Sequence, residues 1–128
     1  MSGYKDLIVW NKSIDLVVCV YEVTNKFDKD EKYVLTQQLK RAAISVSSNI
    51  AEGSQRGSSP DFIRFLNMSR GSVAEIETQI IIAERLKYIS NEELKKLEER
   101  LKEIGVMLNG LVKSLKNKAT QQLSNVAT

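Results

Sequence analysis

The stretch from Leu94 to Leu115, LKKLEERLKEIGVMLNGLVKSL, carries the clearest structural pattern in the chain. Its large apolar residues recur at intervals of three or four, at Leu94, Leu97, Leu101, Ile104, Leu108, Leu111 and Leu115. Because an α-helix completes a turn every ~3.6 residues, this spacing places them on one face of a helix. The polar residues between them cover the other faces, so the stretch predicts a long amphipathic helix.

Three earlier segments show the same spacing. The core-facing positions that it predicts are Leu7, Trp10, Ile14, Val17 and Tyr21 in the first, Leu35, Leu39, Ala42, Val46 and Asn49 in the second, and Phe62, Leu66, Ser69, Val73, Ile76, Ile80 and Ala83 in the third. Sustained strand-like alternation is absent from the sequence. We therefore predict an all-α fold.

The links between these segments are short, at roughly three to seven residues, which favours antiparallel neighbours. Residues that commonly start or stop helices stand at the links: Asp30 as cap of the second helix, Gly53-Ser54 at its end, Ser59 as cap before Pro60 and Asp61, and Ser90 with Glu93 as a capping box. The sequence thus predicts a single-domain, antiparallel up-down-up-down four-helix bundle over residues 4–117. Residues 118–128 are expected to form either a frayed helical extension or a disordered tail.

Composition excludes several classes of function. The 128 residues include one cysteine and no histidine, so a Ser-His-Asp triad, a His-ligated zinc and an intramolecular disulfide are all ruled out. The longest apolar run, Leu16–Tyr21, is far shorter than the ~20 residues that cross a bilayer. The first residues lack the apolar core of a signal peptide. We expect a cytoplasmic protein without catalytic residues, metal, cofactor or membrane partner.

The first and third helices carry more apolar residues than one core-facing stripe needs. The runs at 16–21 and 80–83 surround their helices, although a four-helix bundle leaves each helix an outer face. We interpret the outer positions as a subunit interface, which predicts a homo-oligomer. Scattered exposed apolar residues, which are common on monomers, are the alternative.

A polar motif ends the second helix, where Ser45 and Asn49 occupy positions that helices seldom give to such residues. The third helix offers Ser72 and Glu75 opposite them. We predict a hydrogen-bonded polar layer made of Ser45, Asn49, Glu52, Ser72 and Glu75. An active site is the alternative, but the serines have no histidine base, and Lys40 lies on another part of the helix surface.

Four motifs resemble one protein family. They are YKDLIVWNK at 4–12, QLKRAAISV at 38–46, SNIAEG at 48–53 and FIRFLNMSRGSVAEIET at 62–78. Together they resemble the bacterial 23S rRNA intervening-sequence proteins, also called four-helix bundle proteins, over roughly residues 4–116. The resemblance implies a four-helix bundle, assembly into homopentamers as in related bundles, and binding of RNA or other nucleic acid. A distantly related group serves as accessory proteins to a reverse transcriptase.

Charge is unevenly distributed along the chain, whose formal net charge is +3. Residues 37–72 and 104–128 are the positive segments, and the second of these holds three lysines and no acid. An up-down-up-down bundle would bring Lys5, Lys12, Arg56, Arg64, Lys113, Lys116 and Lys118 to one end. The candidate nucleic-acid-binding residues are Lys40, Arg41, Arg56, Arg64, Arg70, Lys113, Lys116 and Lys118. Ordinary surface charge is the alternative.

Two functions follow as expectations. The first is a nonenzymatic oligomer that binds RNA or DNA through a basic end surface, mainly by backbone contacts. The second is a protein-interaction scaffold or accessory subunit, for example of a polymerase, with little nucleic-acid affinity of its own.

Overall fold

The computed structural model describes residues 3–27 and 33–127, which form helices joined by short connections. The elements are a short 3-10 helix η1 (Tyr4–Asp6) and the α-helices α1 (Ile8–Thr24), α2 (Tyr33–Ser54), α3 (Ser59–Arg85) and α4 (Asn91–Ala127). Within the described ranges there is no strand, and the all-α prediction is confirmed.

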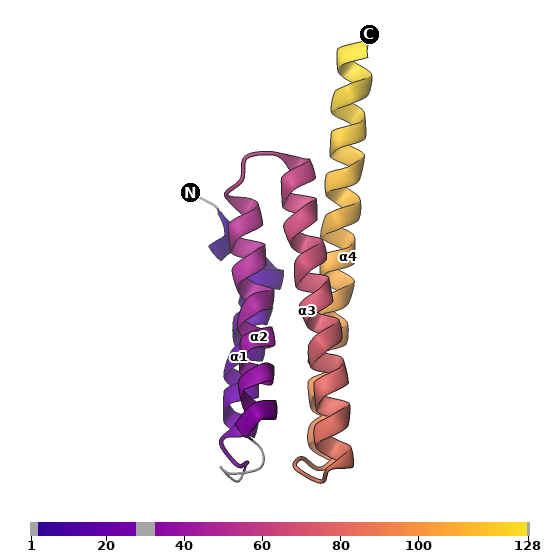
Figure 1. Cartoon of the computed structure of the whole chain (residues 1–128). Helices are drawn as coiled ribbons and strands as arrows, with labels where there is room; N and C mark the ends of the chain where they lie inside the picture. The colour runs from indigo at the N-terminus through magenta and orange to yellow at the C-terminus, as the bar shows by residue number, and fades with distance from the viewer. Residues whose placement is uncertain (1–2, 28–32, 128) are drawn as a thin grey trace.

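Each helix packs on the next one in the chain, and α1 also packs on α4. In the described part of the chain the backbones of α1 and α3, and those of α2 and α4, do not approach each other closely, so these pairs lie diagonally across the bundle. Figure 1 shows the α2–α3 connection and the N-terminal residues at the end toward which α4 runs, and the α3–α4 turn at the other end. This is the predicted up-down-up-down topology.

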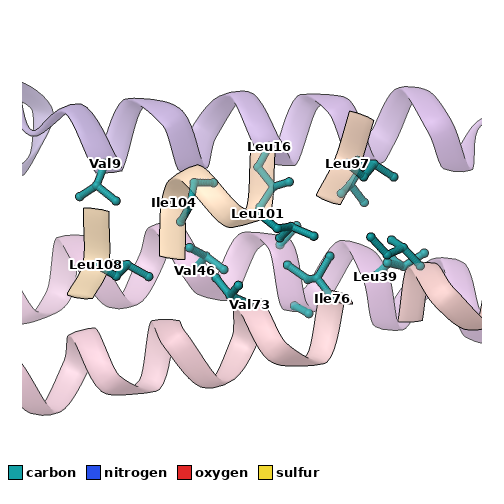
Figure 2. Packing of buried hydrophobic residues seen from close by; sticks show 14 of the residues in the cluster. Val9, Leu16, Leu39, Val46, Val73, Ile76, Leu97, Leu101, Ile104 and Leu108 are labelled. Atoms are coloured by element: carbon teal, nitrogen blue, oxygen red, sulfur yellow. The ribbon is translucent and has the colours of Figure 1, made fainter. Parts of the chain in front are cut away.

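Side chains from all four helices meet in one apolar core (Figure 2). The stripes predicted for α2, α3 and α4 supply most of it: Leu39, Ala42, Val46, Leu66, Val73, Ile76, Ile80, Leu97, Leu101, Ile104 and Leu108 are all buried. Burying such side chains contributes roughly 1.5–3 kcal/mol each relative to exposure, so this core is the main source of the bundle's stability.

The predicted core face of α1 is wrong. The buried residues of α1 are Val9, Ser13, Leu16, Val20 and Thr24, while the predicted Tyr21 is 42% exposed and Trp10 is half-buried. Because α1 is apolar nearly all round, more than one set of apolar residues has the helical spacing of three and four. The spacing alone therefore does not identify its core face. The true stripe contains two hydroxyl residues, each bonded to its own helix: Ser13 to the Trp10 carbonyl at 2.6 Å, and Thr24 to the Val20 carbonyl at 2.8 Å.

Two of the predicted helix starts can be compared with the structure. The cap of α3 is Ser58 rather than Ser59, since the Ser58 side chain accepts a hydrogen bond from the Asp61 backbone N–H at 3.3 Å. The capping box of α4 is confirmed: Glu93 N–H donates to Ser90 Oγ, and Ser90 N–H donates to Glu93 Oε1, both at 3.0 Å. The predicted cap Asp30 lies outside the described residues.

The second helix ends at Ser54, as Gly53-Ser54 predicted. Gly53 itself is buried inside the last turn without a left-handed conformation, and the positive φ of the connection, 87°, belongs to Gly57. A Cβ on Gly53 would lie 2.6 Å from Phe65 Cβ. The glycine is therefore required for the close approach of α2 and α3.

The most extended feature is α4, which has 37 residues against 27 in α3. At ~1.5 Å per residue α4 is about 15 Å longer, and Figure 1 shows it running past the α2–α3 connection. The sequence predicted either a helical extension or a disordered tail for the last residues, and residues 118–127 continue α4 as a helix. No helix in the described residues is long and apolar enough to span a membrane.

Candidate nucleic-acid interface

The lysines of the second half of α4 lie near the end of the bundle that also holds the α2–α3 connection. The helices α3 and α4 run antiparallel from the turn between Arg85 and Asn91, so residues equally far from that turn lie at the same level. Lys116 is therefore level with Pro60, and Lys113 and Lys118 also lie at the level of the start of α3. All three are exposed, and none forms an ion pair with a described residue. Their charges are therefore available to an anionic ligand.

Two arginines, one from the α2–α3 connection and one from α3, lie at the same end and both contact one aromatic ring. The guanidinium carbon of Arg56 is 4.8 Å from the centre of the Phe65 ring, and that of Arg64 is 4.5 Å away. Phe65 is only 4% exposed, so the ring anchors both cations at the surface of the bundle. Such cation–π contacts contribute about 0.5–1 kcal/mol each at exposed sites.

Some of the charge at this end is already paired. Arg56 contacts Glu52 and Arg64 contacts Asp61, both at 3.2 Å. Lys12 of α1, which the sequence assigned to this end, lies nearer the middle of the bundle, where it contacts Glu103 of α4 at 2.7 Å. These side chains are all substantially exposed, and such surface pairs contribute only ~0–1 kcal/mol. A phosphate can therefore compete for the arginines at little cost. The α4 lysines nevertheless carry the larger share of uncompensated charge.

Three of the predicted binding residues lie elsewhere. Lys40 sits 4.5 Å above the Tyr21 ring, and Arg41 bonds to Gln38 at 2.8 Å and to Glu75 at 3.2 Å. Both belong to the first half of α2, toward the opposite end of the bundle. Arg70 lies 11 residues into α3 from Ser59, where it bonds to Asn67 at 3.0 Å. The structure therefore brings Arg56, Arg64, Lys113, Lys116 and Lys118 to one end and leaves these three apart.

The polar motif of α2 lies at its contact with α3. Ser72 Oγ donates to Ser45 Oγ at 2.9 Å across the two helices, and Asn49 donates to the same hydroxyl at 3.0 Å. Ser69, which is fully buried, donates to the Val46 carbonyl at 2.8 Å. These bonds leave Ser45 and Ser72 engaged with one another, as in a layer that fixes the register of two helices.

The two carboxylates assigned to this layer lie at its edges. Glu75 forms the α2–α3 ion pair with Arg41, and Glu52 pairs with Arg56 within α2 and its following connection. In the described part of the chain, no hydrogen bond joins either carboxylate to Ser45, Asn49 or Ser72. Both are exposed, because they lie on the solvent side of the α2–α3 seam.

Sequence reasoning missed two contributors to the basic end. Phe65 holds both arginines, although no sequence pattern distinguishes it from other core aromatics. The second contributor is the continuation of the polar face of Lys113 and Lys116, which were predicted, through Asn117 and Thr120, which were not; all four side chains are exposed. Its spacing of three, four and seven residues was visible in the sequence, but the expected end of the helix near 117 concealed its continuity.

Comparisons with known proteins agree with this architecture. A family model described as 23S rRNA-intervening sequence protein matches residues 5–110. The fold is similar to a crystal structure of a protein with unknown function from the S23 ribosomal protein family of Bacteroides thetaiotaomicron, with a TM-score of 0.77 and 27% sequence identity. That similarity covers 83% of this chain and 99% of the other. A search of curated proteins found no match. Since the family model spans most of the bundle, the chain belongs to the 23S rRNA-intervening sequence protein family.

Proposed function

We propose that this protein is a nonenzymatic, oligomeric bundle that binds nucleic acid through its basic end. The observation that carries the proposal is the charge of residues 104–128, which include three lysines and no acid. Lys113, Lys116 and Lys118 are exposed and lie at the same end of the bundle as Arg56 and Arg64. A phosphate backbone is the polyanion that such a surface attracts most strongly, because its binding releases counterions.

An assembly in which one copy packs against the next would concentrate this charge. Val18 and Tyr21 of α1 are exposed, as are Ile81 and Ile82 of α3, with exposed fractions of 52%, 42%, 38% and 43%. Val17, Val18 and Tyr21 also line a shallow hollow on α1. Because α1 and α3 are diagonal, their apolar strips face different directions. Pairing one strip with the other strip of a neighbour is a head-to-tail contact, which gives a ring when its rotation closes.

The same ring would gather several basic ends on one side. Family resemblance points to five copies, which would multiply the uncompensated lysines around a common axis. Contacts with phosphates alone carry no sequence information, so the binding is expected to depend on backbone charge and shape.

The second candidate is a protein-interaction scaffold or accessory subunit, for example of a polymerase. The observation that favours it is the same set of exposed apolar side chains, which could recruit a partner in place of a second copy. It predicts a stable protein complex and little nucleic-acid affinity of the isolated bundle.

A pair of charge-matched variants tests the first proposal. Lys113→Gln, Lys116→Gln and Lys118→Gln together lower the formal net charge from +3 to 0, as does the control combination Lys95→Gln, Lys96→Gln and Lys102→Gln. All six lysines are exposed on α4. The first variant should lose binding to mixed-sequence RNA and DNA in a mobility-shift assay, and the control should keep most of it. If both variants lost binding equally, the binding would depend on net charge alone and not on the basic end, which would contradict the proposal.

A further inference from the structure

The end of α4 differs from the rest of the bundle because it extends beyond the helices that support it. By its length α4 runs about 15 Å further than α3, and Figure 1 shows its last turns standing apart from the α2–α3 connection. A helix is ~10–12 Å wide with its side chains, so this extension is a protruding rod.

One side of α4, from the turns beside the start of α3 into the rod, is suited to nucleic acid. Lys113, Lys116, Asn117 and Thr120 share a helical face by their spacing, Gln121 adjoins it, and all five are exposed. The first half of α4 is different, since Lys95 and Lys102 stand among five glutamates between Glu92 and Glu103. The second half combines cations for phosphates with amide and hydroxyl groups that can contact base edges.

The width of an α-helix determines which grooves of nucleic acid can admit it. The major groove of B-form DNA, about 12 Å wide and 8.5 Å deep, admits an α-helix. The major groove of A-form RNA is deep and narrow, and side chains cannot read it. Single-stranded nucleic acid is bound largely by stacking on aromatic rings, and the sequence from 91 to 128 contains no Phe, Tyr or Trp.

We propose that α4 over residues 113–121 inserts into the major groove of duplex DNA. Lys113 and Lys116 contact phosphates at the rim of the groove, and Asn117 and Thr120 face the base edges. The helix lies along the groove on its side rather than entering by its tip, because its C-terminal carbonyls carry partial negative charge that phosphates repel. This proposal rests on the nucleic-acid binding proposed above and names its target.

Two single substitutions test the insertion. Thr120→Glu and Val106→Glu each add one negative charge to the same side of α4, seven residues after and seven residues before Lys113. Val106 is 63% exposed and lies where the bundle supports α4. Fluorescence anisotropy would measure the binding of the full-length protein to a mixed-sequence DNA duplex of about two helical turns and to an RNA duplex of the same sequence.

We expect tighter binding to the DNA duplex than to the RNA duplex. Thr120→Glu should weaken DNA binding about tenfold or more, with a much smaller effect of Val106→Glu. Guanine N7, which faces the major groove, should be protected from methylation by dimethyl sulfate. Circular dichroism would verify that both variants keep their helix content.

RNA binding as tight as DNA binding, or equal effects of the two glutamates, would overturn the insertion. In that case loss of RNA binding on replacing Lys113, Lys116 and Lys118 would still support the basic end as a nucleic-acid surface. Binding of neither duplex at low salt would overturn both proposals.

Discussion

Gly53 of α2 and Phe65 of α3 approach so closely that a Cβ on the glycine would lie 2.6 Å from the Cβ of the phenylalanine. It would also lie 3.0 Å from the Phe62 ring and 3.4 Å from the Phe62 carbonyl oxygen. Since Phe65 carries Arg56 and Arg64 on its ring, this contact connects the packing of α2 on α3 with the basic end of the bundle.

Gly53→Ala should therefore destabilise the protein although alanine favours helices. Overpacking a buried site costs about 1–3 kcal/mol, and the gain in helix propensity offsets about 1 kcal/mol of that. Urea unfolding would measure the difference. Gly71→Ala is the matched control, because Gly71 is exposed in α3 and its added Cβ would meet no other helix within 4 Å, and it should gain about 0.5–1 kcal/mol. Stabilisation by both substitutions would show that the close approach does not require glycine.

The Ser45–Ser72 hydrogen bond should appear as a coupling energy. Ser45→Ala leaves the buried Ser72 hydroxyl without its acceptor, and Ser72→Ala removes a donor to Ser45. Each single change should cost about 1–3 kcal/mol, and the double change less than their sum by about 0.5–1.5 kcal/mol. A double-mutant cycle by chemical denaturation measures this. Strict additivity would mean that the bond contributes nothing to the register of α2 and α3.

Acid should weaken the start of α4. The hydrogen bond from the Ser90 backbone N–H, opposed by partial burial and aided by Lys26, lowers the pKa of Glu93 below its ordinary value. A lowered folded-state pKa gives stability that is present above the ordinary value of about 4.3 and is lost as the pH falls through the folded-state pKa. Thermal unfolding should show Glu93→Gln less stable than the unchanged protein at neutral pH, with the difference shrinking as the pH falls through the folded-state pKa of Glu93. A difference independent of pH would contradict the assignment.

Self-association should depend on the apolar strip of α1. Light scattering after size exclusion should give a mass several times the 14.5 kDa of one chain. Val18→Glu should lower that mass because it places a charge among Val17, Val18 and Tyr21. Val106→Glu, at an exposed apolar position on α4, serves as control and should leave the mass unchanged. A monomeric protein before any substitution would exclude the ring.

Periodicity predicted the helices and the core faces of α2, α3 and α4, because each has one dominant apolar stripe. It failed on α1, where Ser13 and Thr24 belong to the core and satisfy their hydroxyls on their own backbone. Grouping cations by segment was also insufficient. Lys40 and Arg41 share a positive segment with Arg56, but they lie in the first half of α2 and Arg56 follows its last residue. The helix therefore places them toward opposite ends of the bundle. Close approaches such as that of Gly53 to Phe65 are set by tertiary packing, which the local sequence does not encode.

The salt dependence of nucleic-acid binding reports directly on whether the lysines of α4 contact phosphates. For B-form DNA the slope of log affinity against log salt concentration is about 0.9 per phosphate neutralised. If Lys113, Lys116 and Lys118 each contact a phosphate, replacing all three with glutamine should reduce the slope by about 2.7. The control replacement of Lys95, Lys96 and Lys102 should leave it nearly unchanged. An identical slope for the unchanged protein and the Lys113, Lys116 and Lys118 variant would show that these lysines contact no phosphates.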